Sequence, residues 1–279
     1  EYFNFLLSHD LIFFTNHPER FPEFILSDGG PELINNAIID SNKLSNHDYD
    51  DIFSQLDLLG CKNVQIRSYS KLSELDITNI EHAFRYKRVT SVEIITKYNK
   101  DISLNSYLSI LKKNLRIKSL IIHSTPKTKI EVINNSYASY MGNLIYTSQI
   151  INSDIHCGEI SKEYFNCNLD SYIISKKYNS CLYKKISIDV SGNIKNCPSM
   201  SQDFGSIRNL SLMDVIVKSS FQKKWKINKD QINVCKDCEY RYICSDCRAF
   251  LNEDNENEKP KKCTYDPYSN LWDIDYAYE

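Results

Sequence analysis

The residues best suited to chemistry in this chain are five cysteines near its end. Cys235 and Cys238 are separated by two residues, Cys244 and Cys247 are spaced in the same way, and Cys263 follows downstream. A thiolate is a soft ligand, and two cysteines at this spacing can close a turn onto one metal centre. Disulfides are the alternative, but close Cys-x2-Cys pairs in a chain without signs of secretion favour a metal or redox site. The spacing therefore predicts a zinc or iron–sulfur site.

Two further cysteines lie upstream, at a spacing that a β-hairpin would bring together. Cys181 is followed by ten residues, Gly192, four more residues and then Cys197. Alternating apolar residues predict a strand over residues 183–190, and the residues around Gly192 have turn chemistry. A return strand would then carry Cys197 back beside Cys181.

The order of these cysteines resembles a SPASM domain, the C-terminal extension of many peptide-modifying radical SAM enzymes. The last internal spacing is two here, where many SPASM domains have three. The resemblance is closest to the SPASM proteins of grasp-with-spasm systems, peptide maturation operons in which such a protein accompanies an ATP-grasp ligase. It covers roughly residues 150 to 270 strongly and the rest weakly. The strings that carry it are HCG at 156–158, NSCLYKKISIDVSGNIKNCPSM at 179–200 and CKDCEYRYICSDCRAF at 235–250.

The resemblance implies two 4Fe-4S clusters in the C-terminal part of the chain. Cys157 is favoured as the fourth ligand of the first cluster, because Gly158 permits a tight backbone approach and the surrounding string matches the family. Cys167 and an open iron are the alternatives, and an open iron could bind substrate. The implied ligands are Cys157, Cys181, Cys197 and Cys247 for cluster one, and Cys235, Cys238, Cys244 and Cys263 for cluster two.

Zinc is the chemical alternative to iron–sulfur. Two zinc ions with four thiolates each would need the same residues, and Cys-x2-Cys spacing does not distinguish the two metals. The overall order of the cysteines favours iron–sulfur through the resemblance. Arg241 and Arg248 flank the thiols and could compensate cluster charge, with ordinary surface salt bridges as the alternative, whereas Cys61 is expected to be a buried structural thiol.

Residues 35–125 show a regular alternation that predicts strands and helices. Four apolar, β-rich runs recur about every 27 residues, and the segments between them carry apolar residues at spacings of three and four. This predicts right-handed βαβ units and a parallel sheet, as in an open (β/α) barrel, although a doubly wound sheet gives the same periodicity. The runs are 37–39, 64–66, 92–95 and 120–122, with a further strand at 144–146 and one or two helices over 211–226.

The predicted barrel lacks the residues that bind SAM in the family it resembles. Radical SAM enzymes use three cysteines in the loop after the first strand, and here that loop, residues 40–47, has none. The position of the family's glycine-rich run holds residues 67–70, Arg-Ser-Tyr-Ser. We therefore expect a degenerate barrel that binds and cleaves no SAM, and we assign no catalytic residue. His47 and His123 have no partner at a motif spacing and are expected to be structural.

Composition sets few limits on function. The chain has 279 residues, 34 basic and 36 acidic, and a net charge of -2, so we expect no general attraction to nucleic acid or an anionic membrane. No signal peptide or membrane-spanning run is visible, and ten cysteines without secretion signals suggest the cytoplasm. Because the chain starts at Glu1 and its first Met is Met141, we expect part of the natural chain to lie upstream.

The predicted fold class is α/β, with a degenerate partial (β/α) barrel of the radical SAM type followed by a Cys-rich SPASM domain. The expected boundaries are 1–30 for the end of an N-terminal peptide-recognition element, 31–150 for the barrel and 151–279 for the iron–sulfur domain. Aromatic-rich residues 1–26 predict a helix leading into a short strand, and the resemblance implies the tail of a winged-helix element. The aromatic residues of 265–276 are expected to pack on the barrel, or else to form a peptide-binding strip.

Three functions follow from the sequence and the resemblance. The first is an accessory iron–sulfur protein that binds the precursor of a ribosomally synthesised peptide and acts with an ATP-grasp ligase. The second is an enzyme that modifies the peptide at a cluster with an open iron. The third is a zinc-stabilised peptide-binding module.

Overall fold

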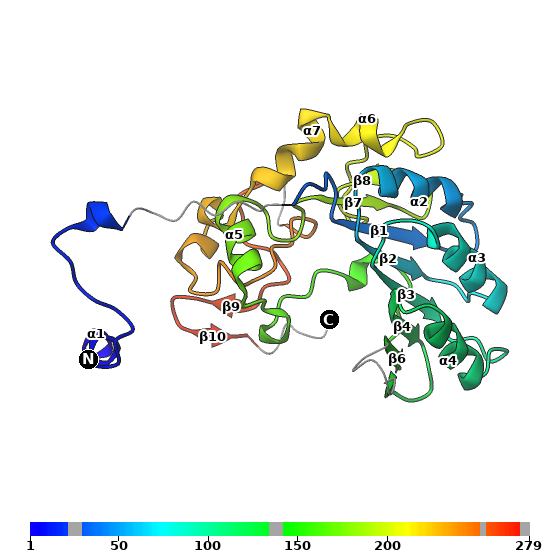
Figure 1. Cartoon of the computed structure of the whole chain (residues 1–279), viewed down its shortest axis with the longest axis horizontal. Helices are drawn as coiled ribbons and strands as arrows, with labels where there is room; N and C mark the ends of the chain where they lie inside the picture. The colour runs from blue at the N-terminus through cyan, green and yellow to red at the C-terminus, as the bar shows by residue number, and fades with distance from the viewer. Residues whose placement is uncertain (22–29, 134–141, 252–254, 274–279) are drawn as a thin grey trace.

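An eight-stranded sheet forms the centre of the computed structural model, which describes residues 1–21, 30–133, 142–251 and 255–273 (Figure 1). The strand order is β5-β6-β4-β3-β2-β1-β7-β8. Neighbours from β7 through β1, β2, β3 and β4 to β6 are parallel, and an antiparallel hairpin closes each edge. The strands are β1 (Asn36–Ser41), β2 (Asn63–Ser68), β3 (Ser91–Lys97), β4 (Ile117–His123), β5 (Lys129–Ile133), β6 (Gly142–Tyr146), β7 (Lys185–Ile188) and β8 (Ile194–Lys195).

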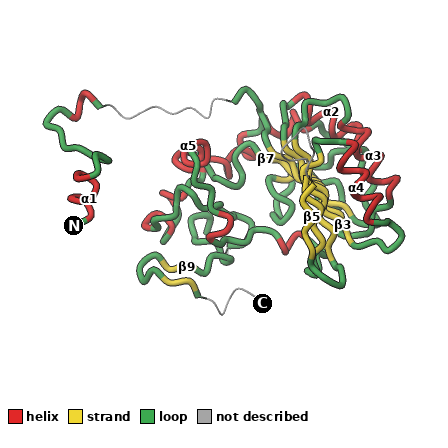
Figure 2. Tube along the Cα trace, turned by 60° about the horizontal axis from the view of Figure 1, so that its bottom comes forward, coloured by secondary structure: helices red, strands yellow, loops and turns green. Residues whose placement is uncertain are grey.

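Three helices cover one face of this sheet, namely α2 (Tyr49–Leu58), α3 (Glu74–Phe84) and α4 (Leu104–Lys113), as Figure 2 shows. Each begins at a side chain that accepts a hydrogen bond from the first helical turn: Asp48, Ser73 and Ser103. The strand residues that face the helices are apolar and buried, and they form one core with the helices' apolar faces. This core includes Ile39, Ile66, Ile94, Phe53, Phe84 and Tyr107.

The connections between β1, β2, β3 and β4 all move in the same direction along the sheet, which confirms the prediction of an α/β fold of partial-barrel type. Strands β1 to β4 lie in sequence order, and right-handed crossovers in one direction place their helices on one face. A doubly wound sheet would instead reverse its strand order and carry helices on both faces. The predicted strands at 37–39, 64–66, 92–95, 120–122 and 144–146 are all present.

The remaining C-terminal residues have little regular structure. They contain the helices α5 (Leu169–Lys177), α6 (Leu212–Ile216) and α7 (Ser219–Gln222) and a small hairpin of β9 (Tyr265–Asp266) and β10 (Leu271–Trp272). The hairpin predicted around Gly192 is confirmed as β7–β8, and β7 pairs with β1 in the main sheet. The boundary at residue 150 therefore stays a prediction, since two strands beyond it belong to the same sheet as the barrel strands. Short 3-10 helices lie at Pro18–Arg20, Asp154–His156, Lys162–Tyr164, Lys223–Lys226, Lys229–Gln231 and Cys235–Asp237.

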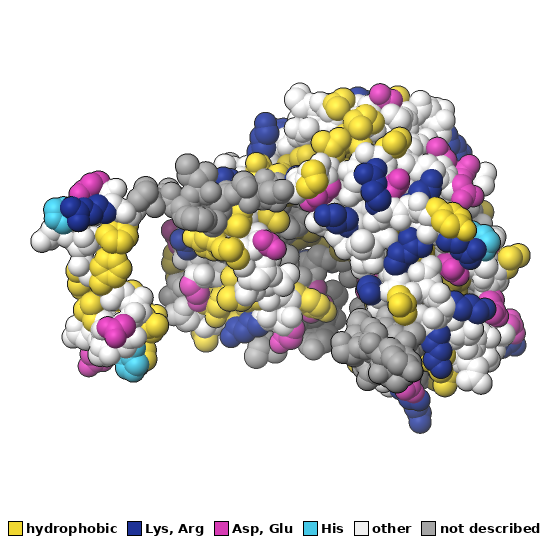
Figure 3. Space-filling model, viewed as in Figure 1, with side chains coloured by type: hydrophobic (Ala, Val, Ile, Leu, Met, Phe, Trp, Pro, Cys, Tyr) yellow, Lys and Arg dark blue, Asp and Glu magenta, His cyan; other side chains and the backbone are white. Residues whose placement is uncertain are grey.

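The N-terminal segment lies apart from the sheet in Figure 1. The predicted helix is present as α1 (Tyr2–Ser8), whereas residues 11–14 form no strand, so that part of the prediction was wrong. Hydrophobic side chains, including Phe3 and Phe14, are exposed along this segment (Figure 3). Residues 22–29 of the predicted recognition element lie outside the described residues. In the described part of the chain, no helix combines the length and hydrophobicity needed to span a bilayer.

Candidate metal centres

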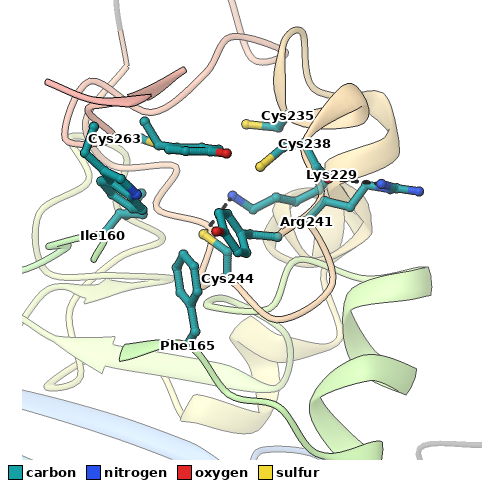
Figure 4. Close-up of a pocket in the computed structure, with 11 residues that line it drawn as sticks. Ile160, Phe165, Lys229, Cys235, Cys238, Arg241, Cys244 and Cys263 are labelled. Carbon is teal, nitrogen blue, oxygen red and sulfur yellow. Dashed lines mark hydrogen bonds between the residues drawn. The ribbon is translucent and has the colours of Figure 1, made fainter. Parts of the chain in front are cut away.

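Four thiols line one cavity in the C-terminal part: those of Cys235, Cys238, Cys244 and Cys263 (Figure 4). They are the four residues implied for cluster two, and we call them the enclosed set. A 3-10 turn joins the first two, because the backbone N–H of Cys238 donates to Cys235 O at 3.1 Å. The structure brings these thiols together, while their role as ligands stays a prediction.

Aromatic side chains surround the enclosed set. Phe165, Tyr240, Tyr265 and Trp272 all line the cavity, and ring centroids lie 5.0 Å apart for Phe165 and Tyr240 and for Tyr265 and Trp272. Tyr265 and Trp272 come from the β9–β10 hairpin, so the prediction that this part of the tail packs on the barrel was wrong. Apolar walls lower the local dielectric and strengthen any charge interaction inside.

Lys229 and Arg241 are the cationic residues that line this cavity, and the amine of Lys229 contacts a thiol. Lys229 is 4% exposed, and its Nζ lies 3.5 Å from Cys244 Sγ and 3.7 Å from an oxygen of Asp246. Burial by itself lowers the pKa of Lys229, but Asp246 and the neighbouring cysteines together raise it more, so the net shift is upward. Sequence reasoning missed Lys229, because the residue belongs to no motif.

Asp246 is held by two further buried groups. Arg248 Nη2 lies 2.7 Å from Asp246 Oδ1, and Asn179 Nδ2 donates to Asp246 Oδ2 at 2.7 Å. Both side chains of the Arg248–Asp246 pair are fully buried, so the surface salt bridge considered for Arg248 was wrong, while its compensation of cluster charge stays a prediction. Arg241 instead pairs with Asp230 near the surface. The buried network fixes the backbone on both sides of Cys247.

The cysteines implied for cluster one also come together, and we call them the groove set. Lys185 Nζ lies 3.3 Å from Cys181 Sγ. Burial lowers the pKa of Lys185, but Cys181, Cys197 and Cys157 each raise it, and the net shift is upward. A Cβ built on Gly158 would lie 2.7 Å from Cys247 Sγ, which places Cys247 against the backbone next to Cys157.

The groove set opens onto a larger space along the sheet. Cys157, Cys181 and Lys185 line a groove with about 1030 Å³ of empty space, which is partly open to solvent. Its floor is the sheet face opposite the helices, at the first residues of β1, β2 and β3. This floor mixes the apolar residue Ile38 with polar side chains, namely Asn36, Asn63, Gln65, Ser91 and Glu93. The two thiol sets therefore differ in environment: aromatic rings surround the enclosed set, whereas the groove set faces a more open groove that contains polar side chains.

The two remaining cysteines belong to neither set. Cys167 is exposed and lines neither the cavity nor the groove. Cys61 is buried, and burial raises its pKa to about 12 while its thiol lies 3.4 Å from Asn63 O. This environment matches the structural role predicted for Cys61.

The described thiols are not arranged around a point at which they would coordinate a single metal ion. Across the four described segments of the chain, no three Cys, His, Asp or Glu side chains are arranged to hold a metal ion. A tetrahedral zinc site needs four sulfurs at about 2.3 Å from one centre. The enclosed set instead lines one cavity with four sulfur donors, a donor set that suits zinc and iron–sulfur groups alike. Burial also raises the pKa of Cys197 to about 12, so metal binding must release protons.

A buried ion pair lies near the C-terminal ends of β1 and β2, beside the loops that lack the SAM-binding residues of radical SAM enzymes. Arg67 donates to Asp40 through Nε at 2.6 Å and Nη2 at 2.7 Å, and Tyr69 Oη donates to the same carboxylate. The expected structural roles of the two histidines fit their contacts, since His47 Nε2 lies 2.8 Å from Asp40 O and His123 Nε2 lies 3.3 Å from Ser68 O. These side chains fill the space above β1 and β2.

The chain resembles one characterised enzyme over part of its length. It is 28% identical over 83 residues to the AdoMet-dependent heme synthase of Nitratidesulfovibrio vulgaris, which is 29% of this chain and 22% of that protein. The chain thus matches less than a quarter of the length of this relative. No family model and no solved structure matches the sequence.

Gly158 provides a direct test of the groove set. An alanine there would have to adopt a φ of +83°, and its Cβ would collide with Cys247 Sγ. We expect Gly158→Ala to reduce the metal content by about half, because the groove set is disturbed while the enclosed set is not. Metal analysis of the purified variant measures this. The control is Gly192→Ala, where φ is also positive (+88°) but the nearest side-chain atom is 3.6 Å away, and it should retain its metal.

Proposed function

We propose that the chain is an accessory iron–sulfur protein for the maturation of a ribosomally synthesised peptide, binding the precursor and acting beside an ATP-grasp ligase. The observation that carries the iron–sulfur part is the enclosed set, in which Cys235, Cys238 and Cys244 line one cavity together with Cys263. Sulfur-only donor sets are typical of zinc and iron–sulfur centres. The partial similarity to an AdoMet-dependent enzyme favours iron–sulfur.

The residues present fit two such clusters. Cys235, Cys238, Cys244 and Cys263 would hold one, and the groove set would hold the other with Cys157 as the fourth ligand. When bound, the clusters would supply electron transfer and structural support. The protein's own groups hold the thiols in place, surround the enclosed set with aromatic rings and place a lysine beside each set.

The peptide part of the proposal rests on the resemblance of residues 150–270 to SPASM proteins that work with ATP-grasp ligases, and on the groove. Its floor offers uncharged amide and hydroxyl groups, such as Asn36, Gln65 and Ser91, which can hydrogen-bond a peptide backbone. A space of this size is in the range of ligand-binding clefts. A precursor lying there would contact the groove set.

A second candidate function is an enzyme that modifies the peptide at the groove set. The observation that favours it is the position of Cys157 and Cys181 on a groove partly open to solvent. If Cys157 were not a ligand, an open iron there would face a bound peptide. The test is Cys157→Ser: loss of cluster iron makes Cys157 a ligand and favours the accessory role, whereas full iron content with loss of peptide modification favours the catalytic one.

Metal and acid-labile sulfide analysis with electron paramagnetic resonance tests the iron–sulfur proposal. We expect about eight irons and eight sulfides per chain in protein purified without oxygen. Two zinc ions and no sulfide would contradict it and leave a zinc-stabilised peptide-binding module. The maturation role is tested in the host by mass spectrometry of the peptide product after replacement of Cys235. Unchanged peptide processing would overturn that role.

A further inference from the structure

We infer that Lys185 and Lys229, one beside each thiol set, raise the reduction potential of the adjacent cluster through their positive charges. This inference rests on the proposed iron–sulfur function. It comes from an arrangement that occurs twice: in two separate sites, one lysine amine points at one thiol. Neither residue belongs to the cysteine pattern.

The lysine of the enclosed set is isolated from water. Lys229 is 4% exposed, lines the cavity with all four thiols, and lies 3.5 Å from Cys244 Sγ, as Figure 4 shows. Holding a flexible, strongly hydrated amine in an apolar cavity is costly unless negative charge compensates it. Asp246 supplies part of that charge, and it is itself shared with Arg248. Thiolates and a reduced cluster would supply the rest.

The lysine of the groove set has fewer competing partners. Lys185 is four residues after Cys181, and its Nζ lies 3.3 Å from that sulfur. Among the described residues no carboxylate forms an ion pair with Lys185, although Glu93 lines the same groove. Its charge is therefore directed at the thiols. Because β7 begins at Lys185, the pairing of this strand with β1 fixes where the lysine stands.

Other cations near the thiols have different contacts. Arg241 also lines the cavity of the enclosed set, but it donates to Cys238 O at 3.0 Å and pairs with Asp230. Lys236 lies between two cysteines in sequence but is exposed. Lys262 Nζ donates to the backbone oxygens of Ile155 and Cys157, and Lys184 Nζ donates to Gly30 O at 3.1 Å. These neighbours provide matched controls, because they carry the same charge close by without an amine on a sulfur.

Reduction adds negative charge to a cluster, so a nearby positive charge stabilises the reduced form. Removing that charge should therefore lower the reduction potential. The two sites should differ in their response to salt, because a charge pair in an enclosed apolar cavity is screened less than one on an open groove. The effect of Lys185 should weaken as ionic strength rises, and that of Lys229 should not.

The experiment is a potentiometric titration of the full-length, cluster-loaded protein with dithionite, followed by electron paramagnetic resonance. We expect Lys185→Gln and Lys229→Gln each to lower the equilibrium constant for reduction of the adjacent cluster at least tenfold, which is 59 mV for one electron. The other cluster should be unchanged. Lys184→Gln and Lys236→Gln, the controls, should change the constant less than twofold. Equal shifts in variants and controls, or no shift in either lysine variant, would overturn the inference.

Variants that keep the charge separate electrostatics from folding. If a Gln variant fails to retain iron, the Arg variant at the same position should retain it, because the positive charge is restored. Loss of iron from both variants would overturn the assignment. If the purified protein holds zinc, the proposed iron–sulfur function fails, and zinc competition with a chromophoric chelator then tests the lysines. The Gln variants should release zinc at a tenfold lower chelator concentration, and an unchanged concentration would count against the inference.

Discussion

Replacing Cys235 by serine is expected to lower the iron content from about eight to about four atoms per chain and to unfold the residues around the enclosed set. Cys235 is buried, and its thiol shares one cavity with those of Cys238, Cys244 and Cys263. These residues have little regular structure of their own, so metal–thiolate bonds would supply much of their stability. Metal analysis measures the first effect, and hydrogen exchange over residues 228–273 measures the second.

The matched control is Cys167→Ser. Cys167 is exposed and lines neither the cavity nor the groove, so this variant should keep all of its iron and its exchange protection. An equal loss of iron in both variants would show that the thiol sets are assigned wrongly. Full iron content in Cys235→Ser would exclude that residue as a ligand.

Replacing Arg67 by methionine is expected to destabilise the sheet by about 3–5 kcal/mol, because it leaves the carboxylate of Asp40 buried without its partner. The two side chains are 7% and 2% exposed, and they are joined by two hydrogen bonds. Urea unfolding followed by circular dichroism measures the change. The control is Arg88→Met, which removes a pair whose arginine is 67% exposed and should cost about 0–1 kcal/mol.

The loss of unfolding free energy caused by Arg67→Met should become smaller as the pH is lowered. Burial raises the pKa of Asp40 above its usual value, and Arg67 offsets part of that rise, so losing the arginine raises this pKa further. A carboxyl whose pKa is higher in the folded state binds more protons there, and stability then falls as pH rises through that range. A deficit that is constant between about pH 4 and pH 7 would contradict this account. In the double variant Asp40→Leu/Arg67→Met the deficit should largely disappear.

The sequence predicted the helix-covered sheet because its signal is local. Runs such as 92–95, and helix faces such as Ile77, Ile80 and Phe84, repeat at the spacings of strands and helices. Helix α5 was not predicted, because only Ile173 and Ser175 are buried and no apolar stripe results. Edge strand β5 was also missed, lying at the rim of the sheet.

The grouping of the cysteines was implied by the resemblance to SPASM proteins, but their surroundings were not. Lys229 and Cys244 are fifteen residues apart, and nothing in the spacing shows that their side chains meet. The same holds for Phe165 and Trp272, whose rings lie 6.2 Å apart. Such contacts depend on how loops fold over one another, which neither periodicity nor composition records. Lys185, four residues after Cys181, is the one lysine that a spacing argument could have found.

The pairing of β7 with β1 makes the sheet and the groove set one cooperative unit. Cys181 and Cys197 flank the β7–β8 hairpin, so any ligand that binds these thiols also holds the hairpin against β1. A ligand that binds only the folded state adds its binding free energy to every element that must unfold with the site. Loss of that ligand should therefore also destabilise β1, including the region of Asp40. Occupancy of the groove set would thus be coupled to the stability of the eight-stranded sheet.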